Sequence, residues 1–174
     1  MSVPPPTPQQ LALAKVLKIS RLNGWSVAVI AGLGTLLSLA FGDLIGSGIG
    51  ILVVGSAAME IHGHRRLKRR DADGMIWLVR SQLFFLGVVL TYAVGRFFSF
   101  DSEAILANLT PEMEALLKES GVTRADIVPL VTTFFHVFYG AVIGLTLIYQ
   151  GGMALYYRRK SPLVAEALAQ PPVI

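Results

Sequence analysis

Four long apolar stretches divide the chain, at about 25–41, 44–61, 75–96 and 128–154. Each is long enough, or nearly so, to cross the roughly 30 Å hydrocarbon core of a bilayer as an α-helix. A turn around Gly42-Asp43 joins the first two stretches, so we expect them to form a tight hairpin. The pattern therefore predicts an all-α polytopic membrane protein with four transmembrane helices in two hairpins.

The segments before and after the spans have a different character. The first ten residues carry four prolines, which predicts a disordered tail over 1–10. From about Gln9 to Leu22, apolar residues share one helical face and Lys15, Lys18 and Arg21 share another. This pattern predicts a short N-terminal helix lying in the membrane interface and ending at Asn23-Gly24. We expect the membrane domain to cover 11–160 and a mobile cytoplasmic tail to cover 161–174.

The segment at about 99–126 is the longest polar connection, and we expect it to be an outer loop with short helices. Ser102 can cap a first helix that ends near Leu109. Thr110 followed by Pro111 is a favourable start for a second helix, because proline lacks the donor that a first helical turn leaves unused. Gly121 is then expected to end that helix.

The charged residues sort by side when the four stretches are laid out as successive crossings. Acidic residues collect at the Gly42-Asp43 turn and in the outer loop, whereas most basic residues collect on the opposite side. The basic residues on that side are Lys15, Lys18, Arg21, Arg65, Arg66, Lys68, Arg69, Arg70, Arg158, Arg159 and Lys160. Because basic loops are retained in the cytoplasm, this asymmetry predicts cytoplasmic N- and C-termini in a bacterial-type plasma (inner) membrane. Lys15 to Arg21 and the apolar run ending at Ser38-Leu39-Ala40 also resemble a secretory signal, so cleavage of the first span stays open.

Composition narrows the classes of function. The chain has a net charge of +4, but its basic residues flank the apolar stretches, so we expect anionic lipid headgroups rather than nucleic acid as their partners. Absence of cysteine excludes disulfides and thiolate metal sites. Glu60, His62 and His64 alternate, but on a helix they point in different directions, so we expect no metal site. Without a recognisable catalytic or cofactor-binding motif, we expect neither an enzyme nor a cofactor.

Glycines recur every fourth residue in two places, at Gly42, Gly46 and Gly50 and at Gly140 and Gly144. Such spacing lets helix backbones approach closely in lipid, where van der Waals contact drives association. The stripes therefore predict helix packing within the chain, with a homo-oligomer contact or a pore lining as alternatives.

Glu60 and Arg80 form the first pair of charged residues inside the predicted spans. A short loop joins their helices, so we expect the inner ends of those helices to be neighbours. A salt bridge, or a snorkelling arginine assisted by Trp77, would reduce the cost of burying Arg80. The functional alternative is a site for an anion or a proton that also uses Gln82.

His136 lies two turns inside the fourth stretch, on the same strip as Thr132 and Gly140. Tyr92 and Arg96 are expected near the same level of the third span. The structural interpretation is a histidine that is hydrogen-bonded to a threonine or tyrosine. The functional alternative is a group that titrates near neutral pH within a membrane site.

Two functional hypotheses follow from these residues. The first is a small integral membrane protein that acts by association, as an accessory, scaffold or assembly subunit with a protein partner or as a homo-oligomer. The second is an oligomeric transporter or channel for a small ion or metabolite, which would use Arg80, Gln82, Arg96 and His136. The sequence gives no ligand, partner or oligomeric state.

Overall fold

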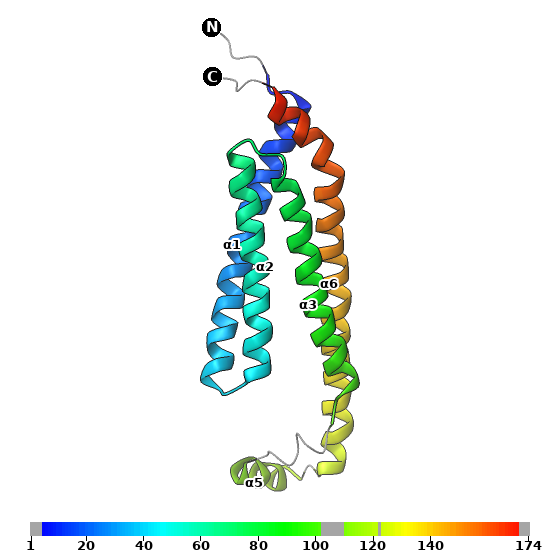
Figure 1. Ribbon diagram of the computed structural model, residues 1–174. Helices are drawn as coiled ribbons and strands as arrows, with labels where there is room; N and C mark the ends of the chain where they lie inside the picture. Colours follow the sequence, from blue (N-terminus) through cyan, green and yellow to red (C-terminus); the bar gives the residue numbers. More distant parts are fainter. Residues whose placement is uncertain (1–4, 102–109, 122, 171–174) are drawn as a thin grey trace. The chain divides into compact units, whose positions relative to one another are not determined.

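The described residues of the protein fold entirely as α-helices. A computed structural model describes 5–101, 110–121 and 123–170, and no strand occurs among them. The helices are α1 (Pro8–Ala40), α2 (Leu44–Lys68), α3 (Gly74–Phe98), α5 (Pro111–Glu119) and α6 (Arg124–Ala169) (Figure 1).

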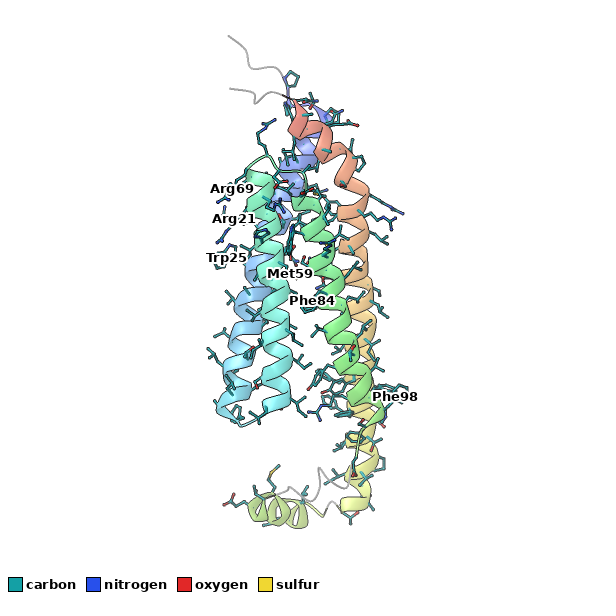
Figure 2. All side chains as sticks on the ribbon, in the orientation of Figure 1. Arg21, Trp25, Met59, Arg69, Phe84 and Phe98 are labelled. Carbon is teal, nitrogen blue, oxygen red and sulfur yellow. The ribbon has the colours of Figure 1, made fainter. Side chains whose placement is uncertain are left out.

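Four helices are long and apolar enough to cross a membrane: α1, α2, α3 and Ala125–Ala169 of α6. Helices of 25 residues such as α2 and α3 extend about 37 Å, more than the hydrocarbon thickness. The most apolar windows of the four are only 17%, 22%, 28% and 0% buried within the chain. Trp25, Phe84 and Phe98 are among the large side chains that project outward (Figure 2). The all-α class and the four apolar helices are thus confirmed.

The chain divides into two compact units. The first unit comprises the described residues of 1–89 and 146–174, and the second comprises the described residues of 90–145. In the first unit, the core consists of side chains from all four long helices, which pack together near the N-terminus of α1 and the C-terminus of α6. The buried members of this core are Val16, Leu67, Met75, Leu78, Tyr157 and Val164.

The first helix is continuous, so the prediction of a separate interfacial helix ending at Asn23-Gly24 is wrong. The Thr7 side chain accepts from the backbone N–H of Gln10, and Gln10 reciprocates, so α1 begins inside the segment expected to be a disordered tail. Asn23 and Gly24 lie within α1 and are both buried. They contact α2 instead of ending a helix, because a small residue and a short amide permit close helix approach.

The α1–α2 hairpin turns where the sequence predicts. Gly42 has a positive φ of 72°, which glycine adopts without strain, and it lies in the turn rather than on α2. Asp43 then accepts from the backbone N–H of Gly46 at 2.9 Å and caps α2. At its other end α2 continues to Lys68, about two turns beyond the predicted 61, so the connection to α3 is a short turn.

That α2–α3 turn is held by ion pairs and by close backbone contact. Arg66 Nε donates to Asp71 at 2.6 Å, and its Nη2 lies 3.5 Å from an oxygen of Asp73. The Arg66 hydrogen bond lowers the pKa of Asp71 below its ordinary value. A Cβ at Gly63 would lie 2.8 Å from the carbonyl oxygen of Gly74, so α2 and α3 meet there backbone to backbone.

The fourth long helix runs to Ala169, so the expectation of a mobile tail over 161–174 is wrong for 161–169. Val164 is fully buried in the core of the first unit, which explains why the helix persists beyond Lys160. Gln9 donates to Glu166 at 3.3 Å, which ties the start of α1 to the end of α6. Arg70 donates to the carbonyl oxygens of Leu168 and Gln170, two acceptors that the helix end leaves free.

The second unit contains the C-terminal part of α3, the helix α5 and the N-terminal part of α6. Thr110 Oγ1 accepts from the backbone N–H of Met113 at 3.3 Å and caps α5, and Gly121 has a φ of 71° shortly after α5 ends. At the start of α6, Thr123 donates both its backbone N–H and its hydroxyl to Asp126 Oδ2, at 3.0 and 2.6 Å. The helix expected from Ser102 to Leu109 lies outside the described residues.

Candidate functional site

A buried carboxylate is the centre of the polar interior of the first unit. Glu60 of α2 is only 2% exposed. Tyr157 of α6 donates its hydroxyl to Glu60 Oε1 at 2.9 Å, and Asn23 of α1 donates its amide to Glu60 Oε2 at 2.7 Å. Both carboxylate oxygens therefore have a donor, and each donor comes from a different helix.

Two further helix contacts extend this cluster. The Tyr149 hydroxyl donates to Asn23 Oδ1 at 3.1 Å, so Asn23 bridges the carboxylate and a second tyrosine of α6. The Gln82 side chain of α3 also interacts with Glu60. We call Asn23, Glu60, Gln82, Tyr149 and Tyr157 the Glu60 cluster; together they connect α1, α2, α3 and α6.

The Glu60 cluster also carries spare hydrogen-bonding capacity. Gln82 Oε1 is buried and has no hydrogen-bond partner among the described protein atoms. A buried acceptor without a donor is costly, and such costs concentrate where a structure performs a function or binds a solvent molecule or ion. The cluster is thus chemically suited to two roles: tying helices together and holding a proton or small cation at a carboxylate.

The salt bridge between Glu60 and Arg80 considered from the sequence is not formed among the described residues. Arg80 is exposed and lines a shallow pocket with Arg158 and Val79, whereas Glu60 points inward. Trp77 packs edge-on against His62, with ring centroids 4.8 Å apart. The helices are neighbours as expected, but hydrogen bonds from Tyr157 and Asn23 satisfy the buried carboxylate, and Arg80 reaches outward instead.

In the second unit, His136 lies among aromatic rings and is half-buried. Its Nδ1 lies 2.8 Å from the carbonyl oxygen of Thr132, one turn earlier in α6. The imidazole packs edge-on against Phe97, with centroids 4.8 Å apart, and against Phe100 at 5.6 Å. The partner of His136 is thus a backbone carbonyl of a threonine and not a threonine or tyrosine hydroxyl.

Tyr92 and Arg96 of α3 belong to the same unit as His136, and their side chains contact each other. Arg96 Nε donates to the Tyr92 hydroxyl at 3.4 Å, and the guanidinium lies 5.5 Å from the Tyr92 ring centroid. Tyr92 also packs against Tyr139, with ring centroids 6.3 Å apart. The second unit therefore gathers Tyr92, Arg96 and His136 in an aromatic environment.

The two glycine stripes have different surroundings. A Cβ at Gly50 would lie 3.2 Å from the Cα of Thr35, and one at Gly46 would lie 2.9 Å from Ser38 Oγ, so both glycines face α1. At Gly140, the nearest atom to such a Cβ is Phe97 Cε2 at 4.0 Å, and at Gly144 nothing lies within 4 Å.

Three members of the Glu60 cluster are not predicted from the sequence: Asn23, Tyr149 and Tyr157. Asn23 looks like a helix end because it precedes a glycine, and Tyr157 looks like an interfacial aromatic because it precedes three basic residues. Tyr149 has no distinguishing neighbour.

Comparison with protein-family models, with curated proteins and with solved structures gives no significant match. The class of protein therefore rests on the helices themselves. Four candidate membrane spans in one chain suggest a multi-pass membrane protein.

Proposed function

We propose that this protein is a small integral membrane protein that acts by association, as an accessory, scaffold or assembly subunit. The observation that carries the proposal is the low internal burial of its four apolar helices, whose most apolar windows are at most 28% buried within the chain. Lipid can cover this surface, but a chain with such shallow packing also offers helix faces to other membrane helices.

The open glycines favour association over a purely lipid-facing surface. Gly144 has nothing within 4 Å of a notional Cβ, and Gly140 has only the edge of Phe97 at 4.0 Å. These positions let a helix of another molecule approach the α6 backbone closely, as small residues do in membrane helix pairs. The partner is then either a larger membrane protein or a second copy of this chain.

The charge pattern supports a defined orientation. We place both termini on the cytoplasmic side of a bacterial-type inner membrane because the basic residues near Lys68 and Lys160 belong to the same end of the first unit. The hydrogen bond between Gln9 and Glu166 supports this placement, since it joins the start of α1 to the end of α6.

The test is crosslinking in native membranes followed by purification of the tagged protein in mild detergent. A stoichiometric adduct with one other membrane protein, or with a second copy, would support the proposal. Recovery of the protein alone after efficient crosslinking would contradict it. Efficiency is checked with the internal contact between Gln9 and Glu166: cysteines placed at these two positions should crosslink within the chain in the same sample.

A second candidate function is an oligomeric transporter or channel for a small ion or metabolite. The observation that favours it is the buried Glu60 carboxylate and its neighbour Gln82, whose Oε1 is buried and has no hydrogen-bond partner among the described residues. Proteoliposome flux that disappears in Glu60→Gln would support this candidate. Absence of any flux, or flux that Glu60→Gln leaves unchanged, would remove these residues from a transport pathway.

A further inference from the structure

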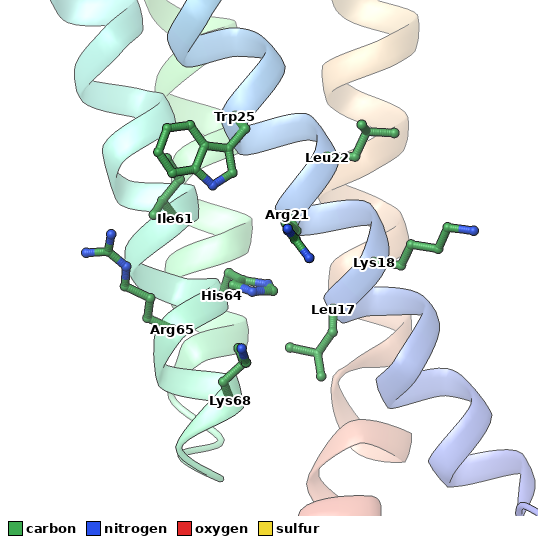
Figure 3. Close-up of a pocket in the computed structure, with 9 residues that line it drawn as sticks. All are labelled: Leu17, Lys18, Arg21, Leu22, Trp25, Ile61, His64, Arg65 and Lys68. Atoms are coloured by element: carbon green, nitrogen blue, oxygen red, sulfur yellow. The ribbon is translucent and has the colours of Figure 1, made fainter.

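An open groove runs between α1 and α2 at the basic end of the first unit. From α1 it is lined by Leu17, Lys18, Arg21, Leu22 and Trp25, and from α2 by Ile61, His64, Arg65 and Lys68 (Figure 3). The two helices are in contact at one end of the groove, where a Cβ at Gly24 would lie 3.1 Å from Ile61 Cγ1. On the side toward the start of α1, the buried Ser20 also joins the two helices, since its Oγ lies 3.0 Å from His64 Nδ1.

Four cations line this groove at helical spacing: Lys18, Arg21, Arg65 and Lys68. All four side chains are exposed, and no lining residue is acidic. Like charges three residues apart on one helix repel, and the groove has one such pair on each helix. Arg21 and Lys68 lie between the two helices, whereas Lys18 and Arg65 lie at the outer sides of the groove (Figure 3). The arrangement leaves an electrostatic cost that an anion in the groove would remove.

Two basic residues near the groove, Arg66 and Arg70, already have partners within the chain. Arg66 pairs with Asp71 and Asp73, and Arg70 binds the carbonyl oxygens at the end of α6. Among the described residues, none of the four groove cations lies within 4.0 Å of a carboxylate, which is the distance of an ion pair. The basic end is therefore not one uniform patch: some of its charges serve the fold, and those in the groove are available to a ligand.

The apolar lining shows what kind of anion fits. Trp25 is 54% exposed and lies with Ile61 at the end of the groove farthest from Lys68 (Figure 3). Beyond Trp25, α1 continues as an exposed apolar face that includes Val29, Ile30 and Leu33. Cations, an amphipathic tryptophan and then hydrocarbon follow one another in the same order as the parts of a phospholipid.

We propose that the groove between α1 and α2 is a binding site for the phosphate headgroup of an anionic phospholipid, with its acyl chains along α1 beyond Trp25. Arg21 and Arg65 supply planar guanidinium groups that match phosphate oxygens, and Lys18 and Lys68 add point charges. Four cations favour a headgroup with more than one negative charge. This site is independent of the proposed role in association, since it concerns a lipid held by one copy of the chain.

A lipid fits this groove better than an acidic protein segment or free phosphate. A peptide carboxylate would pair with the cations but would make no apolar contact with Trp25 and Ile61. Inorganic phosphate would likewise make no contact with the apolar half of the groove. A membrane helix end, moreover, lies at the depth where lipid phosphates are present at high local concentration.

The test is native mass spectrometry of the full chain released from nanodiscs. The nanodiscs contain phosphatidylcholine with either phosphatidylglycerol or cardiolipin, at equal total negative charge. We expect a retained anionic lipid in preference to phosphatidylcholine, with cardiolipin retained more strongly than phosphatidylglycerol. Replacing Lys18, Arg21, Arg65 and Lys68 by glutamine should reduce that retention at least about tenfold.

The matched control removes the same number of charges outside the groove. Its substitutions are Lys15→Gln, Arg158→Gln, Arg159→Gln and Lys160→Gln, and they should reduce retention less than about twofold. A double variant, Arg21→Gln with Arg65→Gln, keeps the test usable if the fourfold variant fails to fold, and it should lose retention to an intermediate extent.

Two results would overturn the proposal. Equal loss of lipid in the groove variant and in the control would show only general attraction between basic residues and an anionic surface. Displacement of the lipid by inorganic phosphate or by a glutamate-rich peptide, each added at the concentration of the lipid, would assign the groove to a soluble phosphate or to an acidic protein segment instead.

Discussion

The two compact units of this chain differ in how much of their apolar helix surface is packed within the chain. The first unit has an interior: a buried core, the Glu60 cluster, and glycines at which α2 lies against α1 or α3. Among the described side chains of the second unit, Ala93 alone is fully buried. Its contacts are mainly ring against ring, and Gly144 faces open space.

This difference shows that the same sequence signal has two uses. Gly46 and Gly50 repeat at the spacing of Gly140 and Gly144, yet only the first pair lies in close contact with another helix of the chain. In the first unit, the helices pack closely and form polar contacts with one another. In the second unit, much of the helix surface is left uncovered by the chain, and we propose that lipid and a protein partner cover it.

The largest expected effect is on close helix contact in the first unit. Gly50→Leu places a side chain where a Cβ would already lie 3.2 Å from the Cα of Thr35, so α1 and α2 must separate. We expect a loss of about 3 kcal/mol in the free energy of unfolding, measured by denaturation in detergent micelles.

Gly48→Leu is the matched control because nothing lies within 4 Å of a Cβ at Gly48. This variant should change the free energy of unfolding by less than about 0.5 kcal/mol. Equal destabilisation by the two substitutions would show that the α1–α2 contact is not as close as described.

A smaller effect is expected from the hydrogen bonds of the Glu60 cluster. Tyr157→Phe removes the hydroxyl that donates to Glu60 Oε1 and leaves that oxygen buried without this donor. The expected cost is about 1–2 kcal/mol in the free energy of unfolding.

The adjacent tyrosine supplies the control for this variant. The Tyr156 hydroxyl is buried and has no partner among the described residues, so Tyr156→Phe should be neutral or slightly stabilising. If Tyr156→Phe cost as much as Tyr157→Phe, ring packing rather than the hydrogen bond to Glu60 would account for both results.

In the second unit we expect the analogous polar substitution to matter less. His136→Phe keeps an aromatic ring against Phe97 and Phe100 and loses one hydrogen bond to the Thr132 carbonyl, within the same helix. The free energy of unfolding should fall by less than about 1 kcal/mol in the same denaturation assay. His136→Ala, which also removes the ring, should cost more; the reverse order would assign His136 a polar role beyond that single bond.

The smallest effect concerns acid sensitivity at the α2–α3 turn. The hydrogen bond from Arg66 lowers the pKa of Asp71 in the folded state, so its stabilising contribution is complete above the ordinary pKa of an aspartate. That contribution is lost as the pH falls through the lower folded pKa. Unfolding followed from about pH 5 to about pH 2 should therefore be less pH-dependent in Asp71→Asn. An unchanged pH profile in that variant would mean that other carboxylates account for the acid response.

The sequence predicts the fold class well because apolar length alone identifies the four helices. Helix ends are less predictable, since they depend on tertiary contacts. Lys160 looks like the end of a span, yet Val164 continues the helix because it is buried in the core. Asn23-Gly24 looks like a helix end, yet both residues are buried inside α1.

The candidate site is only partly predictable for the same reason. Glu60 and Gln82 stand out because polar side chains are rare in apolar stretches. Their partners do not, since no local pattern indicates that Asn23 and Tyr157, 134 positions apart in the chain, meet at one carboxylate. Loop length places α2 beside α3, but it does not say which way Arg80 and Glu60 point.

The most direct test of association compares two pairs of open glycines. Gly140→Leu with Gly144→Leu fills the face of α6 that we assign to a partner. Gly87→Leu with Gly95→Leu fills two positions of α3 at which nothing lies within 4 Å of a Cβ. The measurement is the yield of crosslinked adduct in native membranes, at matched expression and membrane insertion. We predict that the α6 pair lowers the yield at least about tenfold and that the α3 pair changes it less than about twofold. An adduct that survives the α6 substitutions at full yield would contradict association through this face.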